Sequence, residues 1–124
     1  MSLPSSHGVT GTRVGQCLVV SVATDLSPAT MEHLRGITLQ GIEHQDATAA
    51  VLDLTAVPFL DRQEFDEIRK IIRMGGLLGA RVILAGLRPG IVAHLMAANA
   101  DVSGVHACLG LEEALQLLGA RPHA

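Results

Sequence analysis

Residues 49–67 read AAVLDLTAVPFLDRQEFDE, and this stretch predicts a strand, a turn and the first turns of a helix. The apolar run at its start has the length of a buried strand. Pro58 then turns the chain away, because proline fixes its own φ and biases the preceding residue toward extended geometry. Asp61 has the position of an N-cap, and Glu64 can complete a capping box with it. Arg62 is therefore expected on the exposed first turn of a helix, a surface suited to docking rather than to reaction.

The same alternation of apolar runs and helical patterns continues on both sides of this stretch. The predicted strands are residues 9–14, 16–23, 49–54, 81–85 and 104–106, and the predicted helices are residues 28–45, 61–76, 89–99 and 111–118. Ser27 and Pro28 favour a helix start as N-cap and first helical residue. Gly75 and Gly76 are expected to end the helix that begins after Asp61. Strands that alternate with helices predict an α/β fold with parallel strands and right-handed crossovers.

Length and composition predict one domain with an aliphatic core. The chain has 124 residues, of which 48% are apolar and 17% are charged, and this balance argues against disorder. It contains no Trp, no Tyr and two Phe, so the core must be built mainly from aliphatic side chains. We expect residues 1–8 to form a flexible tail and residues 9–120 to form the domain.

Charge and hydropathy argue against nucleic acid and membrane as partners. The net charge of −3 and the scarcity of aromatic side chains disfavour binding to a polyanion. Arg81 and Arg88 interrupt the most hydrophobic region, so no apolar run is long enough to span a bilayer. Residues 1–8 lack the basic and apolar segments of a signal peptide. Cys17 and Cys108 have no metal or disulfide spacing, and the sequence therefore predicts a cytoplasmic protein.

No pattern in the sequence predicts catalysis or a metal site. The chain has six histidines, but none lies three or four residues from another, which is the spacing of helical metal sites. Cys17 lies within a predicted strand, where a thiolate is not stabilised. We therefore expect no enzyme activity, no metal and no cofactor. The turn that contains Gly86, Arg88 and Gly90 leads from a strand into a helix, and it is compatible either with an anion site or with a simple tight turn.

Several segments together resemble the STAS family of anti-sigma-factor antagonists, and within it the small stressosome scaffold proteins of the sigma-B pathway. The phosphorylation loop of that family follows a strand with Asp-Leu-Ser/Thr and, a few residues later, an apolar residue, Asp and Ser. This sequence has Asp53-Leu54-Thr55 and Leu60-Asp61, followed by Arg62 where the family usually has its phosphoacceptor serine. The resemblance continues through residues 15–22, 78–89 and 111–115, and so covers nearly the whole chain.

This resemblance implies a single STAS domain with a mixed central β-sheet and about four helices, which largely cover one side of the sheet. It also implies a non-catalytic protein-interaction domain in a partner-switching or stressosome-type signalling system that regulates a sigma factor or another downstream output. The implied partners are a serine kinase of the histidine-kinase-like ATPase class and other STAS proteins, and a homo-oligomer is left open. The partner surface is expected at Asp61, Arg62, Glu64, Phe65 and Asp66.

Arg62 is the main departure from the family pattern. A guanidinium has no hydroxyl to accept a phosphate, and its charge is opposite to that of a phosphate. The usual switch is therefore missing at this position. Thr55 offers an alternative hydroxyl, although it is better placed to cap the turn locally. Without the resemblance, the charges of residues 61–67 are more typical of a solvated helix start than of a docking surface.

A second hypothesis places the chain in another functional class. It is a STAS domain that binds a small molecule or nucleotide, including the kind that accompanies a transporter. Its site is expected near the strand-to-helix turn, with Gly86, Arg88 and Gly90 around an anion.

Overall fold

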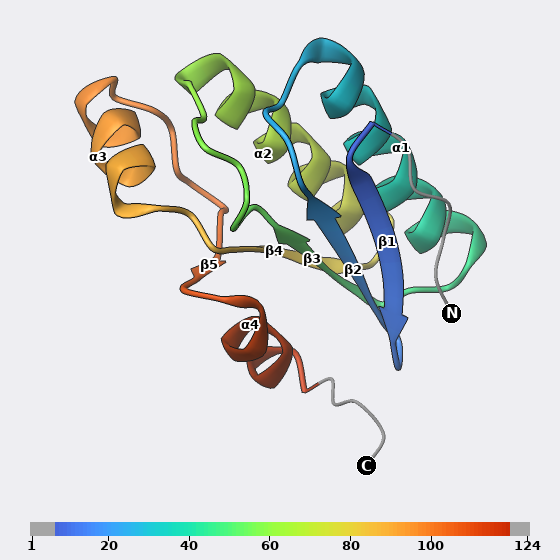
Figure 1. Cartoon of the computed structure of the whole chain (residues 1–124). Helices are drawn as coiled ribbons and strands as arrows, with labels where there is room; N and C mark the ends of the chain where they lie inside the picture. Colours follow the sequence, from blue (N-terminus) through green and yellow to red (C-terminus); the bar gives the residue numbers. More distant parts are fainter. Residues whose placement is uncertain (1–6, 120–124) are drawn as a thin grey trace.

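The computed structural model describes residues 7–119, and strands and helices alternate along them (Figure 1). The elements are β1 (Val9–Val14), β2 (Cys17–Val22), α1 (Pro28–His44), β3 (Ala49–Asp53), α2 (Arg62–Leu77), β4 (Arg81–Ala85), α3 (Pro89–Ala97), β5 (Ala107–Cys108) and α4 (Leu111–Leu117). The strand order in the sheet is β1-β2-β3-β4-β5. β1 is antiparallel to β2, whereas the other neighbouring strands are parallel. The mixed sheet and four helices confirm the predicted α/β fold.

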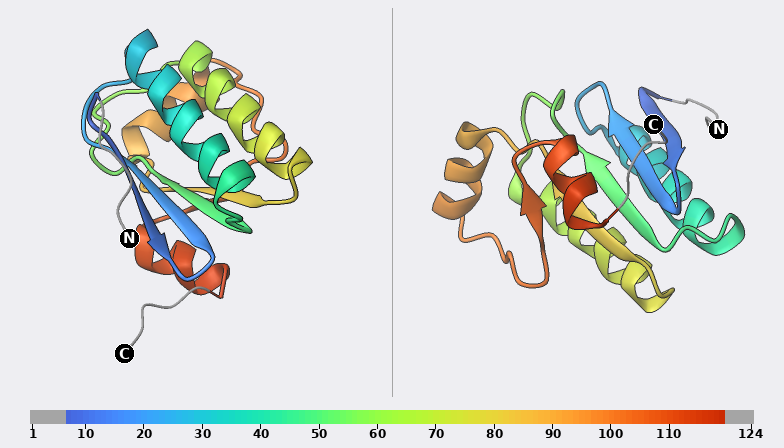
Figure 2. Two further views of the ribbon diagram at one scale, coloured as in Figure 1. Left: turned by 90° about the vertical axis from the view of Figure 1, so that its right-hand side faces the viewer. Right: turned by 90° about the horizontal axis from the view of Figure 1, so that it is seen from below.

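Helices cover the two faces of the sheet unequally. α1 and α2 lie side by side on one face, and α4 lies on the other (Figure 2). α3 belongs to the first side, because Ile91 and Leu95 join the main core there. The helices of this face therefore bury the larger hydrophobic cluster, and α4 buries a smaller one under β3, β4 and β5 through Ala114.

The central strands are apolar on both faces because both faces are buried. In β3, Ala50 and Leu52 face the main core, while Val51 faces the smaller cluster under α4. β4 follows the same alternation, with Leu84 on the first face and Ile83 on the second. A parallel strand covered on both sides reads as a continuous apolar run, which explains the pattern seen in the sequence.

Gly75 and Gly76 do not terminate the second long helix as expected, although the helix ends only one residue later. α2 continues through Gly75 and Gly76 to Leu77. A Cβ atom at Gly75 would lie 2.5 Å from Val82 Cγ2, so glycine here permits close packing of the helix on β4. The chain leaves the helix at Gly79, which has φ of +91°, a conformation that suits glycine at a helix C-terminus.

The expected position of the last strand was also wrong. The strand β5 is Ala107–Cys108, three residues further along than predicted at its start. Residues 102–105 form a turn, in which Val105 N–H donates to the Val102 carbonyl at 3.2 Å. Gly104 in that turn has φ of +76°. The turn takes the N–H of Val105, whereas the carbonyl of His106 pairs with Leu84 N–H of β4 at 2.9 Å.

The start of the described chain is attached to the domain. The Gly8 carbonyl accepts a hydrogen bond from Ala23 N–H at 2.8 Å, and the His7 ring stacks on the ring of His33, with centroids 4.2 Å apart. The sequence predicts that His7 and Gly8 belong to a flexible tail, whereas these contacts attach both residues to the domain. The rest of that predicted tail, residues 1–6, and the predicted last residue of the domain, residue 120, lie outside the described part of the chain.

We expect the two cysteines to react slowly with alkylating reagents in the folded protein, because the thiolate is the reactive form. Cys17 is 2% exposed, and burial raises its pKa from 9.0 to about 11, against a lowering influence of Arg13. Burial also raises the pKa of Cys108.

The folded protein thus holds the Cys17 proton more tightly than the unfolded chain does. The protonated Cys17 thiol therefore contributes to the free energy of unfolding. This contribution is complete below pH 9.0 and is lost as the pH rises through about 11. Mass spectrometry after iodoacetamide treatment, with and without urea, measures the reactivity. Fast labelling of Cys17 in the native protein at neutral pH would contradict this expectation.

Candidate functional site

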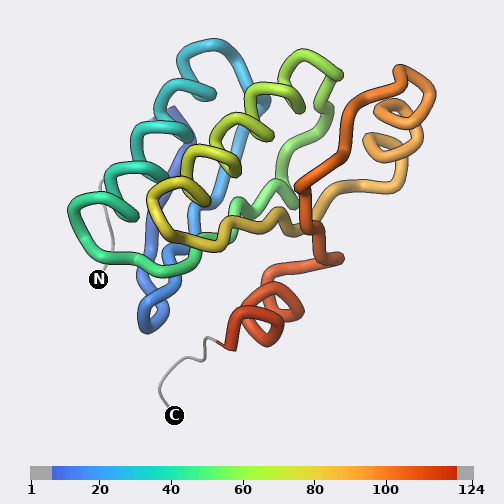
Figure 3. The backbone as a smooth tube through the Cα atoms, turned by 180° about the vertical axis from the view of Figure 1, so that it is seen from behind, coloured from blue at the N-terminus to red at the C-terminus, as the bar shows by residue number. Residues whose placement is uncertain are grey.

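The parallel strands bring the starts of two helices to one edge of the sheet. α1 follows β2 and α2 follows β3, so both helices begin beyond the carboxyl ends of their strands (Figure 3). This edge is the usual location of binding sites in open α/β sheets. The loop between Asp53 and Asp61 lies here, and it contains most of the site predicted from sequence.

Buried apolar side chains hold this loop in place. Leu54, Val57 and Leu60 are each fully buried. Val57 N–H donates to the Leu54 carbonyl at 3.0 Å. At the start of the loop, the Asp53 carboxylate accepts hydrogen bonds from Thr55 N–H at 3.1 Å and from the Thr55 hydroxyl at 2.6 Å. The exposed Thr55 hydroxyl is therefore engaged in a local cap.

The start of α2 has the geometry expected from the sequence. Asp61 Oδ1 accepts a hydrogen bond from Glu64 N–H at 2.8 Å, and Glu64 Oε1 accepts one from Asp61 N–H at 2.9 Å. These two hydrogen bonds form a capping box, which satisfies two of the free amides of the helix. Asp61 and Glu64 are half-buried and fix the helix start, and this leaves Arg62 exposed between them.

Arg62 makes one contact that sequence reasoning missed. Its Nη1 donates to the carbonyl oxygen of Ala98 at 3.3 Å. Ala98 is the C-cap of α3, so the guanidinium lies at the negative end of that helix, where a cation is favourable. The contact joins segments 36 residues apart, and no local pattern could have predicted it.

The two phenylalanines have opposite environments. Phe65 was expected on the partner surface, but it is 2% exposed and lies in the main core. Its place as the fourth residue of α2 turns it toward the sheet. Phe59 is instead 52% exposed, and its ring lies 5.0 Å from the ring of His94. Phe59 is thus the aromatic side chain that this loop presents to solvent.

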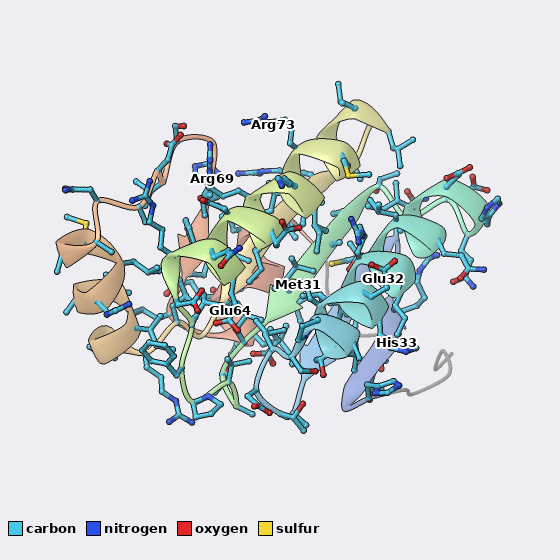
Figure 4. All side chains as sticks on the ribbon, turned by 90° about the horizontal axis from the view of Figure 1, so that it is seen from above. Met31, Glu32, His33, Glu64, Arg69 and Arg73 are labelled. Atoms are coloured by element: carbon cyan, nitrogen blue, oxygen red, sulfur yellow. The ribbon has the colours of Figure 1, made fainter. Side chains whose placement is uncertain are left out.

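A groove runs between the first turns of α1 and α2, and we call it the α1–α2 groove. Its volume is about 390 Å³, and its lining residues are Leu26, Pro28, Met31, Glu32, Arg35, Asp61, Gln63, Glu64 and Glu67. Figure 4 shows Met31 and Glu32 on α1 near Glu64 on α2. The sequence holds a signal for this groove, because Ser27 and Asp61 both cap helices that follow neighbouring parallel strands. The groove has an apolar floor and a largely acidic rim.

The strand-to-helix turn after β4 uses its predicted anion-binding residues for other contacts. Arg88 donates through Nε and Nη2 to the Thr55 carbonyl oxygen, at 3.4 Å each. Gly86 is buried, has φ of +83°, and lies directly against Thr55. Gly90 is exposed in the first turn of α3. The turn therefore ties the β4–α3 connection to the loop after β3.

Metal-binding side chains do not gather at one place in the part of the chain that the structure describes. Within residues 7–119, no group of three His, Cys, Asp or Glu side chains is arranged to hold a metal ion. None of the helices in this same range has both the length and the apolar character needed to cross a membrane. Asp66, the last residue of the predicted surface, is half-buried on α2.

The model of the STAS domain family matches residues 10–114. The chain therefore belongs to the STAS family. A comparison with curated protein sequences gives no significant match.

Several solved structures share this fold. A serine-to-glutamate variant of RsbS from Moorella thermoacetica has a TM-score of 0.74 and 22% identity, over 90% of this chain and 94% of that one. A chain from the structure titled molecular architecture of the stressosome, a signal integration and transduction hub, has a TM-score of 0.69 and 21% identity, over 88% and 95% of the two chains. The murine anion transporter Slc26a9 matches 89% of this chain through 19% of its own length, with a TM-score of 0.69 and 16% identity.

Proposed function

We propose that this chain is a non-catalytic protein-interaction domain in a partner-switching or stressosome-type signalling system. The observation that carries the proposal is the capped start of α2, where Arg62 is exposed and Phe59 of the preceding loop is exposed as well. Membership of the STAS family supports it, as does the shared fold with RsbS and the stressosome chain. On this proposal the protein works in the cytoplasm.

The proposed partner surface combines features that favour protein binding. The buried side chains of Leu54, Val57 and Leu60 anchor the loop to the core, and an anchored loop loses less entropy on association than a free one. Phe59 and Arg62 are residue types that often dominate binding energy at interfaces. The adjoining α1–α2 groove adds an apolar floor with acidic residues around it. A partner with a basic, partly apolar helix fits this combination of shape and charge.

The proposed partners are a serine kinase of the histidine-kinase-like ATPase class and other STAS proteins. Arg62 stands at the position of the phosphoacceptor serine, so we propose that phosphorylation there does not control this member. Either it binds its partner constitutively or it is regulated by another means. In both cases the interaction depends on the same helix start.

The Arg62→Glu substitution tests the partner surface. We expect the affinity for a kinase or STAS partner from the same genome to fall about tenfold, because a charge at the interface is reversed. We expect the thermal midpoint to change little, since an exposed substitution usually costs about 0.5 kcal/mol or less. Isothermal titration calorimetry and thermal unfolding measure the two effects.

Arg13→Glu is a matched control on β1. Arg13 also donates to backbone carbonyls, those of Gly15 and Gln45, so this variant repeats the charge reversal and the lost contact. Its partner affinity should be unchanged. If Arg62→Glu leaves binding intact and lowers the thermal midpoint instead, Arg62 is a structural residue that holds α3, and the proposed surface is wrong.

A further inference from the structure

A second groove lies on a different side of α2, and we call it the α2–β4 groove. It has a volume of about 410 Å³, and its lining residues are Arg69, Ile72, Arg73, Gly76, Ala80, Arg81, Val82, Ile83, Ser103, Gly104, Val105 and His106. It lies between α2, the outer edge of β4 and the segment that leads into β5. The partner surface at the start of α2 does not include it.

Positive charge is concentrated in this groove. Three of the nine Lys and Arg residues line it, although the whole chain has a net charge of −3. No Asp or Glu is among the lining residues. Figure 4 shows Arg69 and Arg73 extending from the same side of α2. Such a separation of charge creates a local positive potential in an otherwise acidic protein.

One of the three arginines, Arg69, is engaged in contacts with the segment at residues 101–103, which forms one side of the groove. Arg69 is 14% exposed and forms an ion pair with Asp101 at 3.2 Å. It also donates to the carbonyl and hydroxyl oxygens of Ser103, at 3.2 Å and 3.1 Å. Hydrogen bonds from Ser103 hold the pKa of Asp101 below its usual range. Asp101 is therefore ionised, and its negative charge offsets Arg69 and part of the charge of the nearby Arg73. The three arginines that line the groove still outnumber this one carboxylate.

The remaining two arginines reach the groove from different elements. Arg73 is exposed on α2. Arg81 is exposed at the start of β4, with its Nη2 lying 3.4 Å from His106 Nδ1. Guanidinium groups that approach from two sides can each present paired N–H donors to one anion, which is the geometry that phosphate oxygens fit.

The edge of β4 that borders the groove offers one backbone residue as a hydrogen-bonding partner. It is too short for a peptide to bind there as an additional strand. Arg81 N–H donates to the carbonyl of Thr48, just before β3, and Leu84 N–H donates to the carbonyl of His106. Successive residues of a strand point their N–H and C=O groups to opposite sides in turn. The N–H and C=O groups of Val82 are therefore directed away from β3, toward the groove. β5 already pairs with Leu84 and Ala85, so a single residue of β4 faces the groove. An added peptide strand needs about three residues or more.

We propose that the α2–β4 groove binds a small phosphate-bearing anion through Arg73 and Arg81, with Arg69 as the positioning residue that keeps the Ser103 wall in place. The groove has the volume of a small-ligand site, for which about 300–1,000 Å³ is typical. The apolar side chains of Ile72 and Val105 also line the groove, and they suit the organic part of such a ligand. This site is distinct from the turn at Gly86, since none of the residues of that turn line it.

Inorganic pyrophosphate is the first probe, with citrate and a short oligoglutamate peptide as anions of other classes. Calorimetry should show saturable binding of pyrophosphate to the whole chain. Amide shifts in NMR spectra should concentrate at Gly76, Val82 and residues 103–106. The double variant Arg73→Gln/Arg81→Gln should bind at least about tenfold more weakly.

The control is the double variant Arg13→Gln/Arg35→Gln. It changes the net charge by the same amount as Arg73→Gln/Arg81→Gln, and neither residue lines the α2–β4 groove. Its affinity should stay within about twofold of the wild type. Equal weakening in both variants would mean general attraction of anions, and it would overturn the site. Binding of oligoglutamate in preference to pyrophosphate would also overturn it, in favour of an acidic protein segment.

Absence of pyrophosphate binding up to about 10 mM would overturn the proposal as well. If the double variant unfolds, the single variant Arg73→Gln provides the test, because Arg73 is exposed on α2. The NMR shifts of the wild-type protein locate the bound pyrophosphate without the use of any variant, so they test the site even if both variants unfold.

Discussion

The Arg62→Ser variant is expected to accept phosphate at residue 62 from a cognate serine kinase, whereas the wild type accepts none there. The wild-type guanidinium has no hydroxyl and stays charged at any cellular pH. A serine at the first position of α2 would lie beside the free amides and positive dipole end of the helix. These groups stabilise a phosphate once it is attached. Mass spectrometry after incubation with kinase and ATP maps the modified residue.

The Arg62→Ala variant is the control for this experiment. It loses the contact with the Ala98 carbonyl, as the serine variant does, but it gains no hydroxyl. We expect no phosphate on it. The other hydroxyls near the grooves are engaged, since Thr55 donates to Asp53 at 2.6 Å and Ser103 donates to Asp101 at 2.7 Å. Stoichiometric phosphate at Thr55 or Ser103 in the wild type would show that the switch has moved, and labelling of no variant would refute the proposed kinase partnership.

The Gly86→Ala substitution is expected to destabilise the fold by roughly 3 kcal/mol or more. Gly86 has φ of +83°, a region that costs a residue with a side chain about 1–3 kcal/mol. The new Cβ atom would also lie 2.8 Å from the Cα atom of Thr55. Because that atom is backbone, relief requires movement of the loop that precedes α2, and overpacking of this kind costs about 1–3 kcal/mol more. Thermal unfolding should show the midpoint falling by roughly 10 °C or more.

Gly90→Ala is the matched control in the same connection. A Cβ atom at Gly90 meets no atom within 4 Å, and its φ is outside the left-handed region. Alanine is also the better helix former, so the stability should be unchanged or slightly higher. If Gly86→Ala has no larger effect than Gly90→Ala, the close contact between Gly86 and Thr55 does not constrain the loop as described.

Local chemistry allowed much of the fold and part of the site to be predicted from sequence. Asp61 and Glu64 lie three residues apart and cap each other's backbone, so their roles depend on neighbours alone. The apolar run of β3 likewise identifies a buried strand without reference to the rest of the chain. Elements defined by neighbouring residues were therefore placed correctly, including the start of α2.

The remaining features depend on contacts between distant segments. Which phenylalanine faces solvent follows from how α2 packs on the sheet, and the sequence around Phe59 and Phe65 does not determine this. Gly75 resembles a helix terminator until its close approach to Val82 is known. The α2–β4 groove joins residues 69–83 to residues 103–106, and its arginines are spread over two elements. Patterns within a short window cannot identify such a cluster.

The strand order of the sheet has a consequence for synthesis. Each strand from β2 onward pairs with the strand made just before it, so the sheet can grow outward as the chain leaves the ribosome, from the N-terminal end first. The face beneath β3 and β4 is covered last, because α4 is the final element of the described chain. Until α4 is made, Val51 and Ile83 remain open on that face. A nascent chain that stalls before Leu111 therefore carries an apolar surface through which it can associate with other chains.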